Sequence, residues 1–226
     1  MDNNRTQWYG SLRSLCGIHG GGKTEQSKKV VNDSFNTSDD GAVIAGVSKC
    51  SSEKSASLAK VNDGHYRLIS SPNGWLDCDI IHKVHVCLRN INPDVEGLQR
   101  PTLGPVRNFN QVNGEFIQIL HTGNAHWVCV GSVGCEDGAF NLYDSLYLII
   151  ILNEEQKQVL NLVGRSNFTG IQQQSNGSDC GVFATAFATC LAYGIHPETV
   201  QFDVPKMRNH LYQSLKSGVL KMFPTF

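Results

Sequence analysis

The sequence lacks a pronounced charge of either sign, a long apolar run and a leader-like beginning. Its 226 residues carry a formal net charge of −1, which favours neither nucleic-acid binding nor an acidic solvating tail. The longest apolar run, residues 146–152, is much shorter than the roughly 20 residues that cross a bilayer. The first ten residues contain no basic region followed by an apolar stretch. We therefore expect no export, no membrane contact and an intracellular location, in the nucleus or the cytoplasm.

Closely spaced cysteine pairs are also missing. None of the eight cysteines forms a C-x-x-C pair, and several lie inside apolar patterns, where a free thiol behaves as a small hydrophobic group. Without an export signal, reduced thiols are the expected state. The eight are Cys16, Cys50, Cys78, Cys87, Cys129, Cys135, Cys180 and Cys190.

The composition divides the chain into a tail and one folded unit. Residues 1–62 are rich in Ser, Asn, Asp, Gly and Lys and have few apolar side chains. Such a segment cannot bury enough apolar surface to offset its ordering entropy, so it is expected to be largely disordered, with at most one short strand at residues 42–47. Residues 63–226 are predicted to form a single domain.

Hydrophobic periodicity within this domain predicts an α+β fold. Alternating patterns predict three strands joined by short turns, which would form an antiparallel meander, and a further strand near the glutamine run. Apolar spacing predicts helices, of which the segment 181–193 is almost wholly apolar and should be buried. The predicted strands are residues 115–120, 126–133, 139–143 and 168–172, and the predicted helices cover 82–88, 154–162, 181–193 and 204–215.

Cys180 stands at the predicted first turn of the apolar helix, directly after the turn signal Asn176-Gly177-Ser178-Asp179. A cysteine nucleophile reacts as its thiolate, and the helix dipole and unpaired N–H groups at a helix start favour negative charge. Ser178 or Asp179 is expected to cap this helix. Taken alone, such a cysteine is more often a packed core residue, as we expect for Cys190.

A thiol nucleophile needs an imidazole as base and a carboxylate to orient that imidazole. His126 opens one predicted strand and Asp144 ends the next. In an antiparallel pair the start of one strand lies beside the end of the next, so the two side chains can meet. His121 is the second candidate for the base, because it lies before the turn and not opposite Asp144.

An oxyanion hole needs donors aimed at the developing negative charge. Gln172, Gln173 and Gln174 precede the turn that leads to Cys180, so one of their amides and the Cys180 N–H are candidate donors. A run of glutamines is otherwise an ordinary solvated loop.

The segment 174–183, QSNGSDCGVF, resembles the active-site signature of ubiquitin-like-protein-specific cysteine proteases, the SUMO-protease superfamily. His126-Trp127 and Tyr143-Asp144-Ser145 resemble the two other catalytic segments of that family, in the same order along the chain. Trp75-Leu76 with Asp77 is similar to its upstream motif. Residues 207–211 and 97–99 resemble compact members of the animal or transposon type.

The resemblance implies a papain-like fold in the ubiquitin-like-protease arrangement, a small antiparallel sheet flanked by helices. It implies that His126, Asp144, Gln174 and Cys180 are base, orienting carboxylate, oxyanion donor and nucleophile. Trp75 and Trp127 would form the walls of a narrow tunnel for the Gly-Gly end of a modifier. The implied protein is a monomeric hydrolase that needs no cofactor and binds ubiquitin-like modifiers or their conjugates. The intervals from Asp144 to Cys180 and from Trp75 to His126 are shorter than is typical of the family.

Several alternatives stay open. A deubiquitinase-like or general thiol protease, or an inactive module that only binds a modifier, would retain the same residues. Residues 17–24, GIHGGGKT, fit the phosphate-loop pattern, but the surrounding tail offers no strand and helix for it. Cys78, His82 and His85, with Cys87 nearby, share one side of a predicted helix and form a candidate zinc site, although the spacing is unusual for zinc.

Overall fold

The structure, a computed structural model, describes residues 61–104, 108–122, 125–146, 166–168 and 170–226. The helices are α1 (Asp63–Ser70), α2 (Cys78–Ile91), α4 (Cys180–Ala192) and α5 (Val204–Ser217), with short 3-10 turns η2 (Pro101–Leu103) and η3 (Pro197–Thr199). The strands are β1 (Glu96–Gly97), β2 (Phe116–His121), β3 (Trp127–Gly131), β4 (Phe140–Tyr143) and β5 (Ser166–Phe168). Residues 1–60 of the predicted tail, which include the strand at 42–47 and the phosphate-loop pattern, lie outside the described residues, as does the helix at 154–162.

One five-stranded sheet organises the domain, in the order β1-β2-β3-β4-β5. The predicted meander is present, because β2, β3 and β4 pair antiparallel. The two outer strands, β1 and β5, pair parallel to their neighbours. The α+β prediction is therefore confirmed, with parallel edges added to the antiparallel centre.

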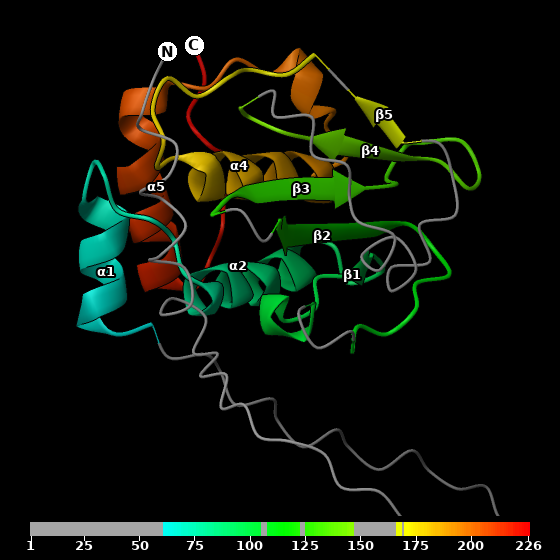
Figure 1. Cartoon of the computed structure of the whole chain (residues 1–226), viewed down its shortest axis with the longest axis horizontal. Helices are drawn as coiled ribbons and strands as arrows, with labels where there is room; N and C mark the ends of the chain where they lie inside the picture. Colours follow the sequence, from blue (N-terminus) through cyan, green and yellow to red (C-terminus); the bar gives the residue numbers. More distant parts are fainter. Residues whose placement is uncertain (1–60, 105–107, 123–124, 147–165, 169) are drawn as a thin grey trace, which may run out of the picture.

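Helices α2 and α4 cover one face of this sheet (Figure 1). Side chains from the two helices and from alternate strand positions, such as Ile117, Ile119 and Cys129, form the main core. All thirteen residues of α4 are buried, which is the physical reason for its almost wholly apolar sequence. Helix α5 lies beside α1 at one end of the sheet. The prediction of a buried central helix is thus confirmed.

The predicted strand at 168–172 was placed too far along the chain. The strand is β5, which ends at Phe168, and residues 170–172 have no strand pairing. Instead, the Gln172 side chain bonds to the backbone of Phe202: its Nε2 donates to the Phe202 carbonyl at 3.1 Å, and its Oε1 accepts from the Phe202 N–H at 2.6 Å. The Gln172 side chain therefore holds residues 170–172 in place, whereas the sequence predicted backbone hydrogen bonds to a neighbouring strand.

Helix α1 was not predicted. Its sequence carries a weak signal, because Asn62 caps the helix and exchanges hydrogen bonds with His65 in a capping box.

Among the described residues, no helix has both the length and the apolar composition that a membrane span requires.

Candidate active site

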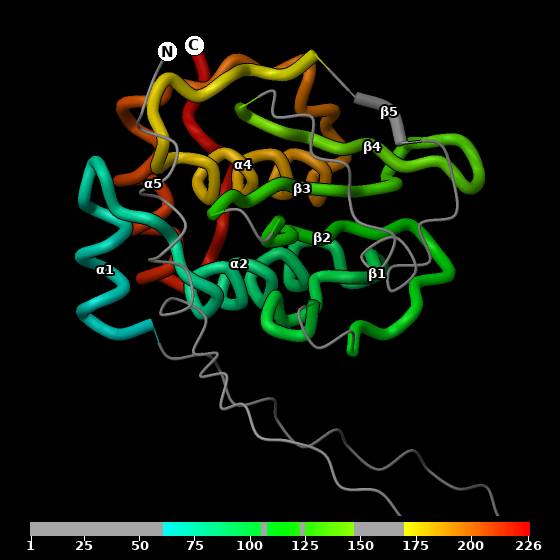
Figure 2. Tube along the Cα trace, in the orientation of Figure 1, coloured from blue at the N-terminus to red at the C-terminus, as the bar shows by residue number. Residues whose placement is uncertain are grey.

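Three chain segments meet at one end of the sheet: the start of β3, the end of β4 and the first turn of α4 (Figure 2). The pairing of Cys129 with Tyr143 brings the beginning of β3 beside the end of β4. His126 immediately precedes β3 and Asp144 immediately follows β4. The sheet register therefore places the imidazole and the carboxylate within reach of each other, as the strand pattern predicted.

The imidazole of His126 is bonded to the carboxylate of Asp144. Nε2 of the ring lies 2.8 Å from Oδ1 of Asp144, and both side chains are nearly inaccessible to solvent. The same Oδ1 also accepts the N–H of Leu146 at 2.9 Å. This second bond fixes the carboxylate against the backbone, so the carboxylate in turn fixes the plane of the ring.

The second ring nitrogen of His126, Nδ1, is buried and has no hydrogen-bond partner among the described residues. The Cys180 side chain lies close enough to the imidazole to influence its pKa. Burial by itself lowers the pKa of His126, but the hydrogen bond to Asp144 and the nearby Cys180 outweigh it and raise the pKa to about 9. Nε2 is committed to Asp144, so Nδ1 is the atom available to exchange a proton with the thiol.

Cys180 is the first residue of α4 and is 2% exposed. Its backbone N–H has no acceptor within the helix, as at any helix start. Asp179 occupies the capping position, as one of the two predicted alternatives, but its side chain makes no capping hydrogen bond. The carboxylate of Asp179 is directed instead to Arg208 of α5, whose Nε lies 2.7 Å from Oδ1.

Arg208 connects the loop that precedes Cys180, residues 175–179 and called the nucleophile loop, to the segments around it. Besides Asp179, its guanidinium donates to four backbone carbonyls, those of Leu68, Ile69, Gly74 and Ser178, at 2.8–3.3 Å. A planar guanidinium with five N–H groups is suited to such a junction. The sequence placed Arg208 only in a resemblance motif. Its spacing gave no hint that it joins α5, the end of α1 and the residue before Cys180.

The three glutamine side chains of residues 172–174 have different hydrogen-bond partners. Gln172 bonds to Phe202, as described above, and Gln173 donates from Nε2 to the carbonyl of Asp144 at 3.1 Å. Gln174 lies nearest to the nucleophile loop: its Nε2 donates to the Asn176 carbonyl at 2.6 Å, and its Oε1 accepts from Ser145 at 2.5 Å. Of the three amides, that of Gln174 is the one held between the carboxylate strand and the loop before Cys180.

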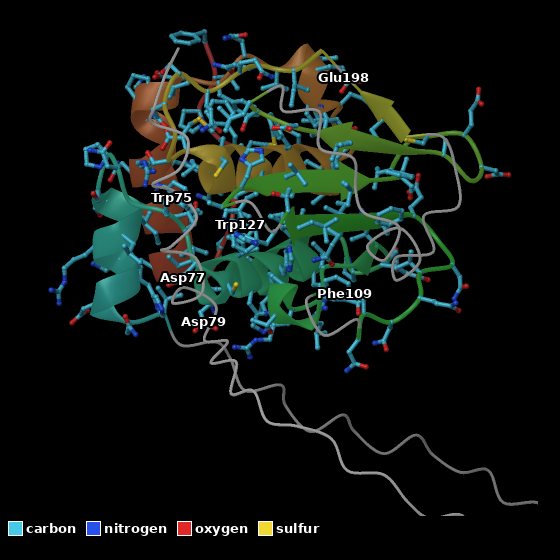
Figure 3. The ribbon with its side chains drawn as sticks, in the orientation of Figure 1. Trp75, Asp77, Asp79, Phe109, Trp127 and Glu198 are labelled. Atoms are coloured by element: carbon cyan, nitrogen blue, oxygen red, sulfur yellow. The ribbon has the colours of Figure 1, made fainter. Side chains whose placement is uncertain are left out.

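Trp75 and Trp127 lie near each other in the domain (Figure 3). Trp75 stands between α1 and α2 and is half-buried, whereas Trp127 is only 4% exposed. The indole N–H of Trp127 donates to the carbonyl of Leu76 at 2.9 Å. Leu76 in turn packs over the start of α4, because a Cβ at Gly181 would lie 3.0 Å from the Leu76 Cβ. The absence of a side chain at Gly181 permits this close approach.

The alternative base, His121, is the last residue of β2. Its ring packs edge-on against Trp127 with centroids 4.8 Å apart. Burial, followed by the nearby His126, lowers the pKa of His121. The hydrogen bond to Asp144 belongs to His126, so the structure favours His126.

The candidate zinc site has a different arrangement from the one considered above. The Nδ1 of His85 is bonded to the Gln99 carbonyl at 2.9 Å, and its Nε2 accepts the N–H of Ile119 at 3.3 Å. Both nitrogens of this fully buried ring are therefore occupied. Within the described ranges, no group of three His, Cys, Asp or Glu side chains could hold a metal ion.

Comparison with known proteins agrees with this geometry. Residues 116–219 match the C-terminal catalytic domain of the Ulp1 protease family. This stretch contains His126, Asp144, Gln174 and Cys180, and it leaves Trp75 outside. No curated protein matches the chain.

Solved structures extend the likeness over more of the chain. One is the SUMO protease Ulp1 with its catalytic cysteine oxidised to a sulfonic acid: TM-score 0.54, 15% identity, 72% of this chain and 87% of that chain. Another is the same protease with the cysteine oxidised to a sulfenic acid: TM-score 0.52, 15% identity, 72% of this chain and 89% of that chain. At such low identity, the likeness establishes the fold.

Proposed function

We propose that the chain, whose residues 116–219 match the catalytic domain of the Ulp1 protease family, is a cysteine peptidase that cleaves after the C-terminal Gly-Gly of a ubiquitin-like modifier. The bond cleaved is the peptide bond of a precursor or the isopeptide bond to a lysine. The observation that carries the proposal is the bond between His126 and Asp144, combined with a free Nδ1 beside Cys180.

The proposed reaction uses each group once. Asp144 holds the ring of His126 through Nε2, and Nδ1 takes the proton of the Cys180 thiol. The sulfur attacks the glycine carbonyl, while the Cys180 N–H and the Gln174 amide stabilise the oxyanion. The imidazolium returns its proton to the leaving amine. A water molecule, deprotonated by His126, then attacks the thioester, and this releases the modifier's carboxylate and restores the thiol.

The proposed substrate tail passes beside Trp75 and Leu76. Trp75 is partly exposed, whereas Trp127 is buried and donates its indole N–H to the carbonyl of Leu76. A Gly-Gly end suits such a tunnel, because side chains larger than hydrogen would not pass a closely packed wall. The SUMO modifier is the first candidate, since the similar solved structures are of a SUMO protease. An intracellular site of action, nuclear or cytoplasmic, completes the proposal.

A panel of modifiers with C-terminal electrophiles tests the proposal with the full chain. We expect covalent capture of a SUMO-type probe, seen as a mass increase, and no capture by Cys180→Ser. Cys190→Ser is the matched control, because Cys190 is 0% exposed and burial raises its pKa to about 12. Capture of the ubiquitin probe alone would indicate a deubiquitinase, and binding without capture an inactive module. Cleavage by Cys180→Ser would contradict the assigned nucleophile.

A further inference from the structure

Ser145 is almost fully buried, with an exposed fraction of 1%, beside the proposed oxyanion donor. Its hydroxyl donates to Oε1 of Gln174 at 2.5 Å, and its carbonyl accepts the Gln174 N–H at 2.9 Å. Side chain and backbone of one serine therefore hold both ends of the same glutamine. The proposed reaction uses Gln174, but it assigns no part to Ser145.

The orientation of an amide decides whether it helps or hinders an oxyanion. A glutamine presents NH₂ on one side and a carbonyl oxygen on the other, and only the NH₂ side stabilises negative charge. A half-turn about the last side-chain torsion exchanges the two groups. In a water-poor site, an oxygen directed at the developing oxyanion would repel it.

Two contacts fix this orientation from opposite sides. The Asn176 carbonyl can only accept, so it holds one N–H of the Gln174 amide, at 2.6 Å. The Ser145 hydroxyl supplies the donor that Oε1 requires. Gln174 is itself buried at 8% exposure, so loss of the serine donor would leave Oε1 with an unmet hydrogen bond. One amide N–H remains for the oxyanion.

We infer that Ser145 is a positioning residue that sets the orientation of the Gln174 amide and so directs its N–H at the oxyanion. This inference rests on the proposed function. It assigns Ser145 no contact with substrate, since its hydroxyl is used by Gln174. The two residues that follow β4 thus have different roles: Asp144 orients the base, His126, and Ser145 orients the oxyanion donor, Gln174.

A double-mutant cycle tests the inference by measuring cleavage of a modifier with a C-terminal amide fluorophore. Loss of a hydrogen bond of ordinary strength predicts that Ser145→Ala lowers kcat about tenfold with little change in KM. Gln174→Ala should lower kcat about 10²- to 10³-fold, as the loss of one oxyanion donor does. In the Gln174→Ala background, Ser145→Ala should have no further effect, because no amide remains to be oriented.

A second readout separates positioning from structural damage. A modifier that ends in an alkyne is captured by the thiol without a carbonyl oxyanion, so Ser145→Ala should capture it at the wild-type rate. Ser214→Ala removes another buried serine hydroxyl, 4% exposed on α5, and should leave both rates unchanged. Thermal unfolding of the two variants checks that both are folded.

The outcomes are distinct. An equal fold-loss in the wild-type and Gln174→Ala backgrounds would overturn the inference, and so would slowed alkyne capture by a folded Ser145→Ala. Absence of both turnover and capture in the wild-type chain would overturn the proposed function and the inference together. No further loss in the Gln174→Ala background, with alkyne capture intact, supports the assignment.

Discussion

The indole N–H of Trp127 donates to the carbonyl of Leu76 at 2.9 Å, across 51 positions of sequence. This bond fastens the segment between α1 and α2 to the first residue of β3, next to His126. Leu76 also packs on Gly181, the neighbour of Cys180. The wall of the proposed substrate tunnel and the proposed catalytic residues are therefore held by one set of contacts.

Trp127→Phe keeps an aromatic ring but removes the donor to Leu76. The buried carbonyl loses its partner, so we expect the free energy of unfolding to fall by about 1–2 kcal/mol. We also expect KM for a modifier substrate to rise more than kcat falls, because the Trp75–Leu76 wall loosens. Urea unfolding and steady-state kinetics measure the two effects. Thr189→Val, which removes a buried hydroxyl in α4, is the control, and an unchanged KM in Trp127→Phe would count against a fastened wall.

Gly181→Ala adds a methyl group where Leu76 leaves little room. The new Cβ would lie 3.0 Å from the Leu76 Cβ and 3.1 Å from its Cδ1. Overpacking of this kind destabilises by about 1–3 kcal/mol, and the displaced Leu76 should also slow turnover. Gly177→Ala, in the loop just before α4, is the matched control, because nothing lies within 4 Å of a Cβ there. Similar losses in both variants, in unfolding and in turnover, would show that the Leu76 contact is not the cause.

The raised pKa of His126 predicts a pH dependence of turnover. Burial lowers this pKa, but the hydrogen bond to Asp144 and the nearby Cys180 raise it to about 9, so the imidazolium that would protonate the leaving amine in the proposed reaction persists through neutral pH. The basic limb of kcat/KM is expected near pH 9. Asp144→Asn removes a group that raises the pKa, so the limb should move to lower pH, with a large loss of rate. A pH profile of fluorophore release measures the limb.

Asp203→Asn is the control for charge removal, since Asp203 is as buried as Asp144, each 7% exposed. Asp203→Asn should leave the basic limb of kcat/KM at the same pH, and an equal movement of the limb in both variants would contradict the pairing of His126 with Asp144.

The raised pKa of His126 also predicts how the stability of the fold depends on pH. Because the pKa of His126 in the folded protein exceeds its unfolded value of 6.5, protonation of His126 stabilises the folded state fully below pH 6.5, and this stabilisation is lost as pH rises through about 9.

Arg208→Ala should destabilise the domain and disturb the nucleophile loop. The pair with Asp179 is largely buried, at 13% and 9% side-chain exposure, and breaking such a pair leaves an uncompensated charge, worth about 3 kcal/mol. Arg208→Lys should recover only part of this, because one ammonium cannot reach Asp179 and all four carbonyls. Urea unfolding with parallel kinetics provides the measurement.

The exposed pair of Arg100 and Asp79 is the matched control, with side chains 48% and 50% exposed. Arg100→Ala should change the free energy of unfolding by no more than about 1 kcal/mol. If Arg208→Ala has an effect as small as that of Arg100→Ala, Arg208 does not hold the loop.

Local patterns predicted much of the fold. Alternation located every end of β2, β3 and β4 to within two residues, and the apolar run located α4. These elements have one strongly buried surface, so their hydrophobic period is clear. Helix α1 and strand β1 escaped prediction because the first is short and polar and the second has only two residues. The strand expected at 168–172 was misplaced, since its boundary depends on the contact between Gln172 and Phe202.

Local features of the sequence are enough to name the residues of the proposed chemistry. A cysteine after a turn, a histidine before a strand and an aspartate after the next strand are local features, and antiparallel pairing brings the last two together. The groups that hold these residues in place are visible only in the folded domain. Arg208, Ser145 and the Leu76 carbonyl act through contacts between segments 29 to 140 positions apart. Contacts of that separation depend on how helices and sheet pack, and no local period in the sequence encodes them.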